Sequence, residues 1–284
     1  MPTSPDPHSQ YITHPSGETS HIIVDDFADP WKPRETVLLQ GGFARHAAFF
    51  HHWVPALSRQ YRVVRRDLRG HGYSSAPARA DKPAAYTLDA VLADIVDTLD
   101  QLGVDRVHFF GESTSGMLGM ILAARHPERV RSLTVCSSPT HLPPATQGFL
   151  AMGRASWPEA CRALGSRGWG QELAKLGGTM SSADDGYRRW WLEQLSVSSG
   201  EGLASYAEFL CTLDARPYLG RIKVPMLILA PTRSAATKIE EQKEVQAQVP
   251  GSKLVPIDGA GHEIYVDSAE ECQNVYREFL AALP

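Results

Sequence analysis

The stretch GESTSG, residues 111–116, constrains the fold most strongly, because it stands between two apolar runs. The run before it, VHFF (107–110), has the length of a buried strand, and the run after it, MLGMILAA (117–124), fits a helix. A serine at such a sharp strand-to-helix reversal projects its hydroxyl from the top of a sheet. The pattern therefore predicts a nucleophile at Ser113, with the amide of Thr114 directed at an oxyanion.

Strand-like and helix-like segments alternate along most of the chain. The strand candidates are residues 21–24, 36–40, 61–66, 107–110, 133–136, 226–230 and 253–257, and the helix candidates are residues 88–102, 117–124, 239–249 and 270–283. Several strand candidates are short and continuously apolar, which is typical of strands covered on both faces. The alternation predicts an α/β fold, with a mostly parallel central sheet and helices on both faces. We expect residues 9–138 and 217–284 to form this core, and residues 1–8 to be a disordered tail.

One region interrupts the alternation. Residues 139–216 contain no convincing strand, only helix-compatible pieces separated by Gly, Pro and Ser, and they hold four of the six tryptophans. A helical insertion of this kind predicts a lid over the carboxyl edge of the sheet, where open α/β sheets bind ligands. Within it we expect Trp157, Trp190 and Trp191 to bind substrate.

Composition excludes several classes of partner. The formal charge of −4, without any basic run, gives no field that would attract nucleic acid. No apolar stretch reaches the roughly 18 residues that a membrane span needs, and the polar start MPTSPDPHSQ lacks a signal-peptide pattern, so we expect a cytoplasmic protein. No metal-ligand spacing is apparent among the histidines, and we expect no metal or cofactor. The cysteines show no C-x-x-C spacing and are interpreted as core residues: Cys136, Cys161, Cys211 and Cys272.

The motifs and their order along the chain resemble those of the α/β-hydrolase superfamily, and the resemblance extends over nearly the whole chain. The superfamily's G-x-S-x-G motif appears here as G-x-S-x-S, and we expect Ser115 to be accommodated by a small shift at the strand–helix contact. LLQGGF (38–43) resembles the H-G-x oxyanion loop with Gln40 in place of histidine, which implies that Gly42 supplies a second amide donor. The resemblance therefore implies an oxyanion hole formed by Gly42 and Thr114.

Two further segments carry the same resemblance. DLRGHGYSS (67–75) is similar to a superfamily segment whose role is mainly structural. GAGHEIY (259–265) is similar to the loop that bears the catalytic histidine, which makes His262 the general base. A serine hydroxyl needs such a base before it becomes a useful nucleophile.

The third member of a Ser-His-acid triad is missing from its usual place. Aligning PTRSAATKIEEQ (231–242) with the superfamily's acid segment puts Ser234 where aspartate is expected, and the other loop that carries the acid in some relatives, residues 136–141, also lacks a carboxylate. The acid therefore comes from elsewhere, or the enzyme uses a Ser-His dyad. The conceivable suppliers of a carboxylate are Glu112, Asp214 and Asp258.

The motifs predict a serine hydrolase that cleaves an ester or lactone through an acyl-enzyme on Ser113. DDFADPW (25–31) resembles 3-oxoadipate enol-lactonase-like proteins, which suggests a lactone or ester, and the aromatic lid favours a largely apolar small molecule. A carbon–carbon bond hydrolase or lyase with the same Ser-His pair remains an alternative. So does a weakly catalytic ligand receptor on the same fold. The oligomeric state is open, with a homodimer as one alternative.

Overall fold

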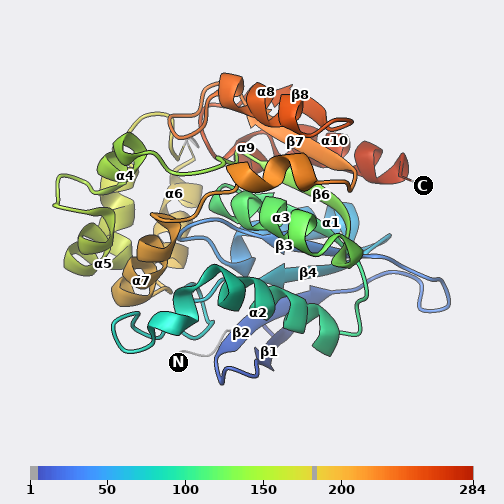
Figure 1. Ribbon diagram of the computed structural model, residues 1–284, viewed down its shortest axis with the longest axis horizontal. Helices are drawn as coiled ribbons and strands as arrows, with labels where there is room; N and C mark the ends of the chain where they lie inside the picture. Colours follow the sequence, from blue (N-terminus) through green and yellow to red (C-terminus); the bar gives the residue numbers. More distant parts are fainter. Residues whose placement is uncertain (1–5, 181–183, 284) are drawn as a thin grey trace.

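A single eight-stranded sheet forms the centre of the computed structural model, which describes residues 6–180 and 184–283 (Figure 1). The strands are β1 Ser9–Thr13, β2 Thr19–Asp25, β3 Thr36–Gln40, β4 Arg62–Arg66, β5 Val107–Glu112, β6 Val130–Cys136, β7 Met226–Pro231 and β8 Lys253–Ile257. The α-helices are α1 Val54–Leu57, α2 Leu88–Gln101, α3 Thr114–Arg125, α4 Pro144–Leu150, α5 Trp157–Leu173, α6 Asp185–Leu195, α7 Gly200–Leu210, α8 Ile239–Gln248, α9 Ile264–Asp267 and α10 Ala269–Ala281. The described residues also form four 3₁₀ helices: η1 Ala47–Trp53, η2 Pro83–Tyr86, η3 Pro127–Arg129 and η4 Arg216–Arg221.

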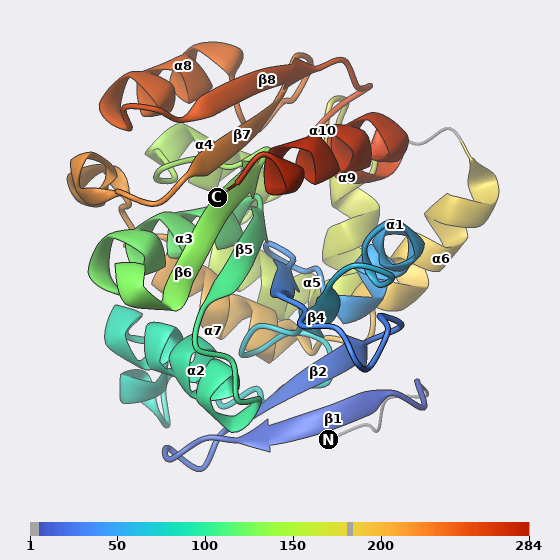
Figure 2. The ribbon, with the colours of Figure 1, turned by 90° about the vertical axis from the view of Figure 1, so that its right-hand side faces the viewer.

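The sheet is mostly parallel, with the strand order β1-β2-β4-β3-β5-β6-β7-β8. Strands β1 and β2 join it in antiparallel pairings, and every pairing from β4 to β8 is parallel. Figure 2 shows α3 and α8 on one face of the sheet and α1 and α10 on the other. This covering explains why β3, β5 and β7 are buried at every position. The predicted α/β fold with a mostly parallel sheet is confirmed.

Each predicted strand and helix corresponds to an observed one, with ends displaced by at most a few residues. The first strand, β1, was not predicted. Its sequence SQYIT contains no apolar run, because as an edge strand it buries only Ile12 and leaves Tyr11 exposed. Residues 1–5 of the expected tail lie outside the described residues, and residues 6–8 lead into β1.

Helices α4 to α7 occupy the region that was expected to be a helical lid. Figure 1 shows them together at one end of the sheet. A bridge between His141 and Asp214 brings the two ends of the region side by side. Helix α5 bends at Gly165, whose φ of 67° interrupts the helical backbone. None of the helices in residues 6–180 and 184–283 is long and apolar enough to cross a bilayer.

A close contact between β5 and α3 fixes the turn that joins them. A Cβ placed on Gly111 would lie 2.6 Å from the carbonyl oxygen of Ser115 and 2.7 Å from the amide nitrogen of Gly116. Real Cβ atoms do not approach backbone atoms so closely, so only glycine allows this approach. The contact places the start of α3 directly against β5, immediately after Ser113.

We expect Gly111→Ala to lower the free energy of unfolding by about 2 to 3 kcal/mol, because the added methyl group must push α3 away from β5. Gly148→Ala is the matched control, since a Cβ on Gly148 in α4 meets no atom within 4 Å. The control should be neutral or slightly stabilising. Urea unfolding followed by circular dichroism compares the two variants, and equal stability would contradict the close strand–helix contact.

Candidate active site

Ser113 lies at the bend between β5 and α3, in a backbone conformation that is rare for residues other than glycine. Its φ is 50° and its ψ is −125°. Two neighbours from the end of β6 hold it there: the Ser113 amide donates to the carbonyl of Cys136 at 2.8 Å, and the Ser138 hydroxyl donates to the Ser113 carbonyl at 2.7 Å. Such strain persists only when the surroundings enforce it. The predicted nucleophile therefore has the backbone geometry of a strand-to-helix elbow.

Ser115, the departure from the usual glycine, is built into the same turn. Its side chain is fully buried, and its hydroxyl donates to the carbonyl of Gly41 at 2.6 Å. Gly41 belongs to the loop that follows β3. The hydroxyl therefore ties the start of α3 to the predicted oxyanion loop.

His262 comes from the loop between β8 and α9 and faces Ser113. Its Nε2 lies 2.9 Å from Ser113 Oγ. The Ser137 hydroxyl donates to the His262 carbonyl at 2.7 Å, which fixes the loop against the end of β6. Burial lowers the pKa of His262 to about 4, so the imidazole is neutral at ordinary pH. A neutral imidazole is the form that can accept a proton from the serine.

Ser234 lies on the other side of the imidazole, at the place expected for the acid. Its Oγ is 2.9 Å from His262 Nδ1. The same oxygen accepts hydrogen bonds from the amides of Ala236 and Thr237, both at 3.1 Å. The Thr237 hydroxyl also donates to this oxygen, at 3.2 Å. Ser234 therefore holds the imidazole at Nδ1 without bringing a charge to it. The tautomer that can take the proton of Ser113 is the one that carries its own proton on Nδ1.

The three carboxylates considered as substitutes do not face Nδ1. Glu112 Oε1 lies 3.8 Å from His262 Nε2, on the Ser113 side of the ring. Asp214 pairs with Arg216. Asp258 pairs with Arg233 and is largely exposed. Among the described residues, Nδ1 is hydrogen-bonded to the hydroxyl of Ser234 and to no carboxylate.

Both predicted oxyanion donors belong to residues next to Ser113, but one of the two amides is already hydrogen-bonded. Thr114 is the first residue of α3. Gly42 approaches so closely that a Cβ on it would lie 2.7 Å from Ser113 Cβ. The Gly42 amide, however, donates to Glu112 Oε2 at 2.7 Å. Burial raises the pKa of Glu112 from its ordinary value of 4.5 to about 7, although the charge of Arg45 and the Gly42 amide oppose this.

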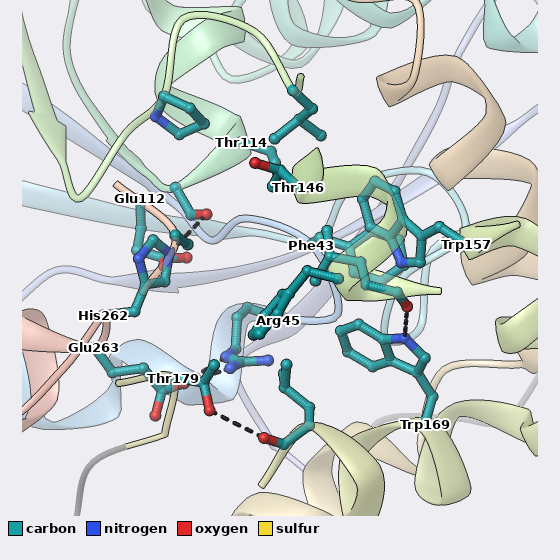
Figure 3. Close-up of a pocket in the computed structure, with 17 residues that line it drawn as sticks. Phe43, Arg45, Glu112, Thr114, Thr146, Trp157, Trp169, Thr179, His262 and Glu263 are labelled. Atoms are coloured by element: carbon teal, nitrogen blue, oxygen red, sulfur yellow. Dashed lines mark hydrogen bonds and ion pairs between the residues drawn. The ribbon is translucent and has the colours of Figure 1, made fainter. Parts of the chain in front are cut away.

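A cavity opens beside Ser113 and His262, between the sheet and helices α4 and α5 (Figure 3). It encloses about 710 Å³ of atom-free space, part of which is open to solvent. Its apolar wall consists of Phe43, Leu142, Phe149, Leu150, Trp157, Trp169 and Leu173. The ring of Phe43 packs against Trp157 and Trp169, with centroids 4.4 and 5.2 Å away. The loop after β3 thus contacts the helical region directly.

The structure places the three predicted substrate-binding tryptophans differently. Trp157 lines the cavity, whereas Trp190 and Trp191 are not among the described residues that line it. Trp191 is fully buried and donates to Glu263 Oε1 at 3.0 Å, and Trp190 packs against Phe49. Both side chains instead pack α6 against the core, through Glu263 and Phe49. Trp169, which was not among the predicted residues, lines the cavity together with Trp157.

A buried ion pair at the polar end of the cavity was not predicted. Arg45 Nε donates to Glu263 Oε1 at 2.9 Å, and Arg45 Nη2 donates to the same oxygen. Tyr187 also donates to Glu263, at 3.1 Å. Burial alone would lower the pKa of Arg45, but the carboxylate of Glu263 raises it, so the guanidinium stays charged. No motif marks this pair, because an arginine and a glutamate 218 residues apart meet only in the folded chain.

The profile of the family described as alpha/beta hydrolase fold matches residues 35–269. The chain belongs to this family. Relatives within the alpha/beta hydrolase fold family include 3-oxoadipate enol-lactonase 1 of Acinetobacter baylyi, which is 24% identical and covers 97% of this chain and 98% of its own length. Putative carbamate hydrolase RutD of Stutzerimonas stutzeri is 24% identical over 87% of this chain and 91% of its own length.

Solved structures show the same fold. The enol-lactonase from Burkholderia xenovorans superposes with a TM-score of 0.84 at 24% identity, covering 96% of this chain and 100% of its own. An esterase from Exiguobacterium antarcticum superposes with a TM-score of 0.81 at 19% identity, covering 96% of this chain and 99% of its own. Family membership and the relatives support hydrolysis as the reaction class.

The raised pKa of Glu112 predicts a pH-dependent stability. Between its ordinary pKa of 4.5 and about 7 the folded protein keeps a proton that the unfolded chain has lost, so this group makes stability fall as pH rises. Glu112→Gln removes the effect. The difference in unfolding free energy, variant minus parent, should therefore be about 2 to 3 kcal/mol larger at a pH of about 8 than at a pH of about 5. Denaturant titrations at both pH values measure it, and a constant difference would contradict the buried, protonated glutamate.

Proposed function

We propose that this protein is a serine hydrolase that cleaves an ester or lactone of a largely apolar substrate through an acyl-enzyme on Ser113. The observation that carries the proposal is the 2.9 Å contact between Ser113 Oγ and His262 Nε2 at a strained strand-to-helix bend. The bend also opens into a cavity with an apolar wall.

In the proposed reaction Ser113 Oγ attacks the carbonyl carbon, and its proton passes to His262 Nε2. The carbonyl oxygen becomes an oxyanion between the amides of Gly42 and Thr114. The carbon–oxygen bond to the leaving alcohol then breaks, and the alcohol takes the proton from His262. Water repeats the sequence on the acyl-enzyme and releases the acid. In a lactone the alcohol and the acid remain one molecule.

The substrate class follows from the walls of the cavity. Four aromatic rings, those of Phe43, Phe149, Trp157 and Trp169, would contact an apolar acyl or alkyl group. The five arginines between residues 139 and 190 do not form an anion-binding wall, since they are exposed: Arg154, Arg162, Arg167, Arg188 and Arg189. We therefore favour an apolar ester or lactone over a small dianion.

The nucleophile assignment predicts that Ser113→Ala abolishes hydrolysis. A panel of aryl esters and lactones should be cleaved by the parent, and the variant should lose at least about 10³-fold in kcat/KM, because no other group can form the acyl-enzyme. Ser9→Ala is a matched control, since Ser9 also bonds a histidine, His21, but lies in strand β1. Equal rates for Ser113→Ala and the parent would eliminate the proposed nucleophile.

The empty acid position predicts a gain of activity in Ser234→Asp. A carboxylate has enough lone pairs to accept from Ala236, Thr237 and His262 Nδ1 together, which fixes the productive tautomer and stabilises the imidazolium. We expect kcat to rise by about tenfold or more. The acid limb of the kcat/KM profile should also move upward from about 4, because a nearby anion raises the pKa of His262.

Ser234→Ala serves as the control for that variant. It removes the hydroxyl without adding charge, so neither change should occur. If Ser234→Asp instead left both kcat and the acid limb unchanged, a carboxylate would already act on His262 from another position, and the dyad would be wrong.

A ligand receptor is the second candidate, favoured by the hydroxyl at the acid position and by the engaged Gly42 amide. A fluorophosphonate distinguishes the two functions, because it reacts with an activated serine. Stoichiometric labelling at Ser113 supports the hydrolase. Binding of apolar esters without labelling or turnover supports the receptor.

A further inference from the structure

The amide expected to stabilise the oxyanion is already hydrogen-bonded to a side chain of the protein. Gly42 donates to Glu112 Oε2 at 2.7 Å. A Cβ on Gly42 would lie 3.0 Å from that oxygen and 2.7 Å from Ser113 Cβ. Gly42, the carboxyl group of Glu112 and the side chain of Ser113 are therefore close neighbours. The carboxyl group thus lies where the carbonyl oxygen of a substrate would need this amide. Substrate and Glu112 compete for one donor.

An ionised carboxylate at this point opposes acyl transfer in two ways. It uses the N–H group that should receive the oxyanion, and its charge repels the negative charge that develops on the substrate. Glu112 is only 2% exposed, so water screens this repulsion weakly. Acyl transfer therefore requires the carboxyl group to leave the amide or to lose its charge.

Arg45 offers the carboxyl group a second position. It lines the same cavity as Glu112, and Figure 3 shows both side chains there. Two of its nitrogens donate to Glu263, but Nη1 is buried and has no hydrogen-bond partner among the described residues. A buried guanidinium N–H without an acceptor is unfavourable, and a carboxylate is the acceptor that satisfies it best.

We propose that Glu112 is a gate with two positions, which covers the Gly42 amide when the cavity is empty and moves to Arg45 Nη1 when an acyl substrate enters. One charge-assisted hydrogen bond replaces another, so the movement itself costs little free energy. The carbonyl oxygen of the substrate then accepts a hydrogen bond from the Gly42 amide. This inference rests on the proposed serine-hydrolase function and deepens it, because it makes Glu112 a positioning residue for the oxyanion site.

The charged surroundings of Glu112 make the gate sensitive to pH. Five titratable groups lie near the carboxyl group of Glu112 or interact with its charge: Arg45, Cys136, His262, Glu263 and Tyr265. Burial holds the pKa of Glu112 at about 7 against the opposing field of Arg45. Below this pH the carboxyl group is neutral, so it no longer repels an oxyanion and binds the amide more weakly. His262 remains a neutral base there, because burial lowers its pKa to about 4.

The rate of fluorophosphonate labelling at Ser113 tests the gate. In this reaction Ser113 Oγ bonds to phosphorus, fluoride leaves, and the serine proton passes to His262, while the phosphoryl oxygen needs the oxyanion site. We expect Glu112→Ala to label about tenfold faster than the parent at a pH of about 8, since the Gly42 amide becomes free. The difference should shrink at a pH of about 5.5. Glu128→Ala, an exposed glutamate beyond the far end of α3, is the control and should match the parent.

Glu112→Gln is a second variant, which distinguishes the effect of the lost charge from a folding defect in Glu112→Ala. It keeps the length of the side chain and removes its charge, so its labelling rate should exceed that of the parent at a pH of about 8 and stay constant down to about 5.5. A Glu112→Gln rate that follows the pH profile of the parent would overturn the gate.

A double-mutant cycle tests the role of Arg45. Arg45→Lys keeps a cation for Glu263 but removes Nη1, so it should slow labelling in the parent and leave the Glu112→Ala rate unchanged. Equal slowing in both backgrounds would indicate a structural role for Arg45 and overturn the second position.

The outcomes also separate this inference from the proposed function. Labelling of the parent at Ser113, with Glu112→Ala no faster, overturns the gate and leaves the hydrolase intact. Failure of both proteins to label, with behaviour identical to Ser113→Ala, overturns the nucleophile and the gate with it.

Discussion

The close approach of three backbone segments around Ser113 is the constraint on which the site depends. Gly111 lets α3 start directly against β5, and Gly42 lets the loop after β3 touch Ser113. The Ser115 hydroxyl, bonded to Gly41, joins those two contacts. The serines that follow β6 complete the support, because one holds Ser113 and the other holds the loop of His262. The geometry at Ser113 is therefore set by segments at the carboxyl ends of four parallel strands, β3, β5, β6 and β8, rather than by any single motif.

This dependence explains how much of the fold and the site could be predicted from the sequence. Apolar runs and glycines are local signals. The seven strands from β2 to β8, the bend at Ser113 and the order of the loops that carry Gly42 and His262 could therefore be predicted. Strand β1 was missed, because an edge strand needs only one buried side chain, Ile12. The absence of a carboxylate near Ser234 was likewise visible in the sequence, and the 2.9 Å contact of Ser234 with His262 Nδ1 matches that interpretation.

Features that depend on side chains meeting across the fold could not be predicted. Glu112 was visible beside the serine, but its direction toward the Gly42 amide depends on how β3 and β5 pair. The Arg45–Glu263 pair joins the loops after β3 and β8. The expectation for Trp190 and Trp191 rested on composition alone. The place of Trp191 depends on the acceptor that its indole meets in the folded chain, which is Glu263.

Hydrogen-bonded groups of the right types do not by themselves make a catalytic site in this molecule. His21 lies between Ser9 and Asp67, with Nε2 3.0 Å from the hydroxyl and Nδ1 2.8 Å from the carboxylate. Chemically this is a more complete triad than the group around Ser113. Ser9, however, lies in the extended strand β1, and Asp67 also accepts backbone amides from two loops, as a structural anchor does. What distinguishes Ser113 is its strained bend beside two backbone amides and an apolar cavity, so the position of the serine in the fold, more than its hydrogen-bond partners, supports the chemistry proposed for it.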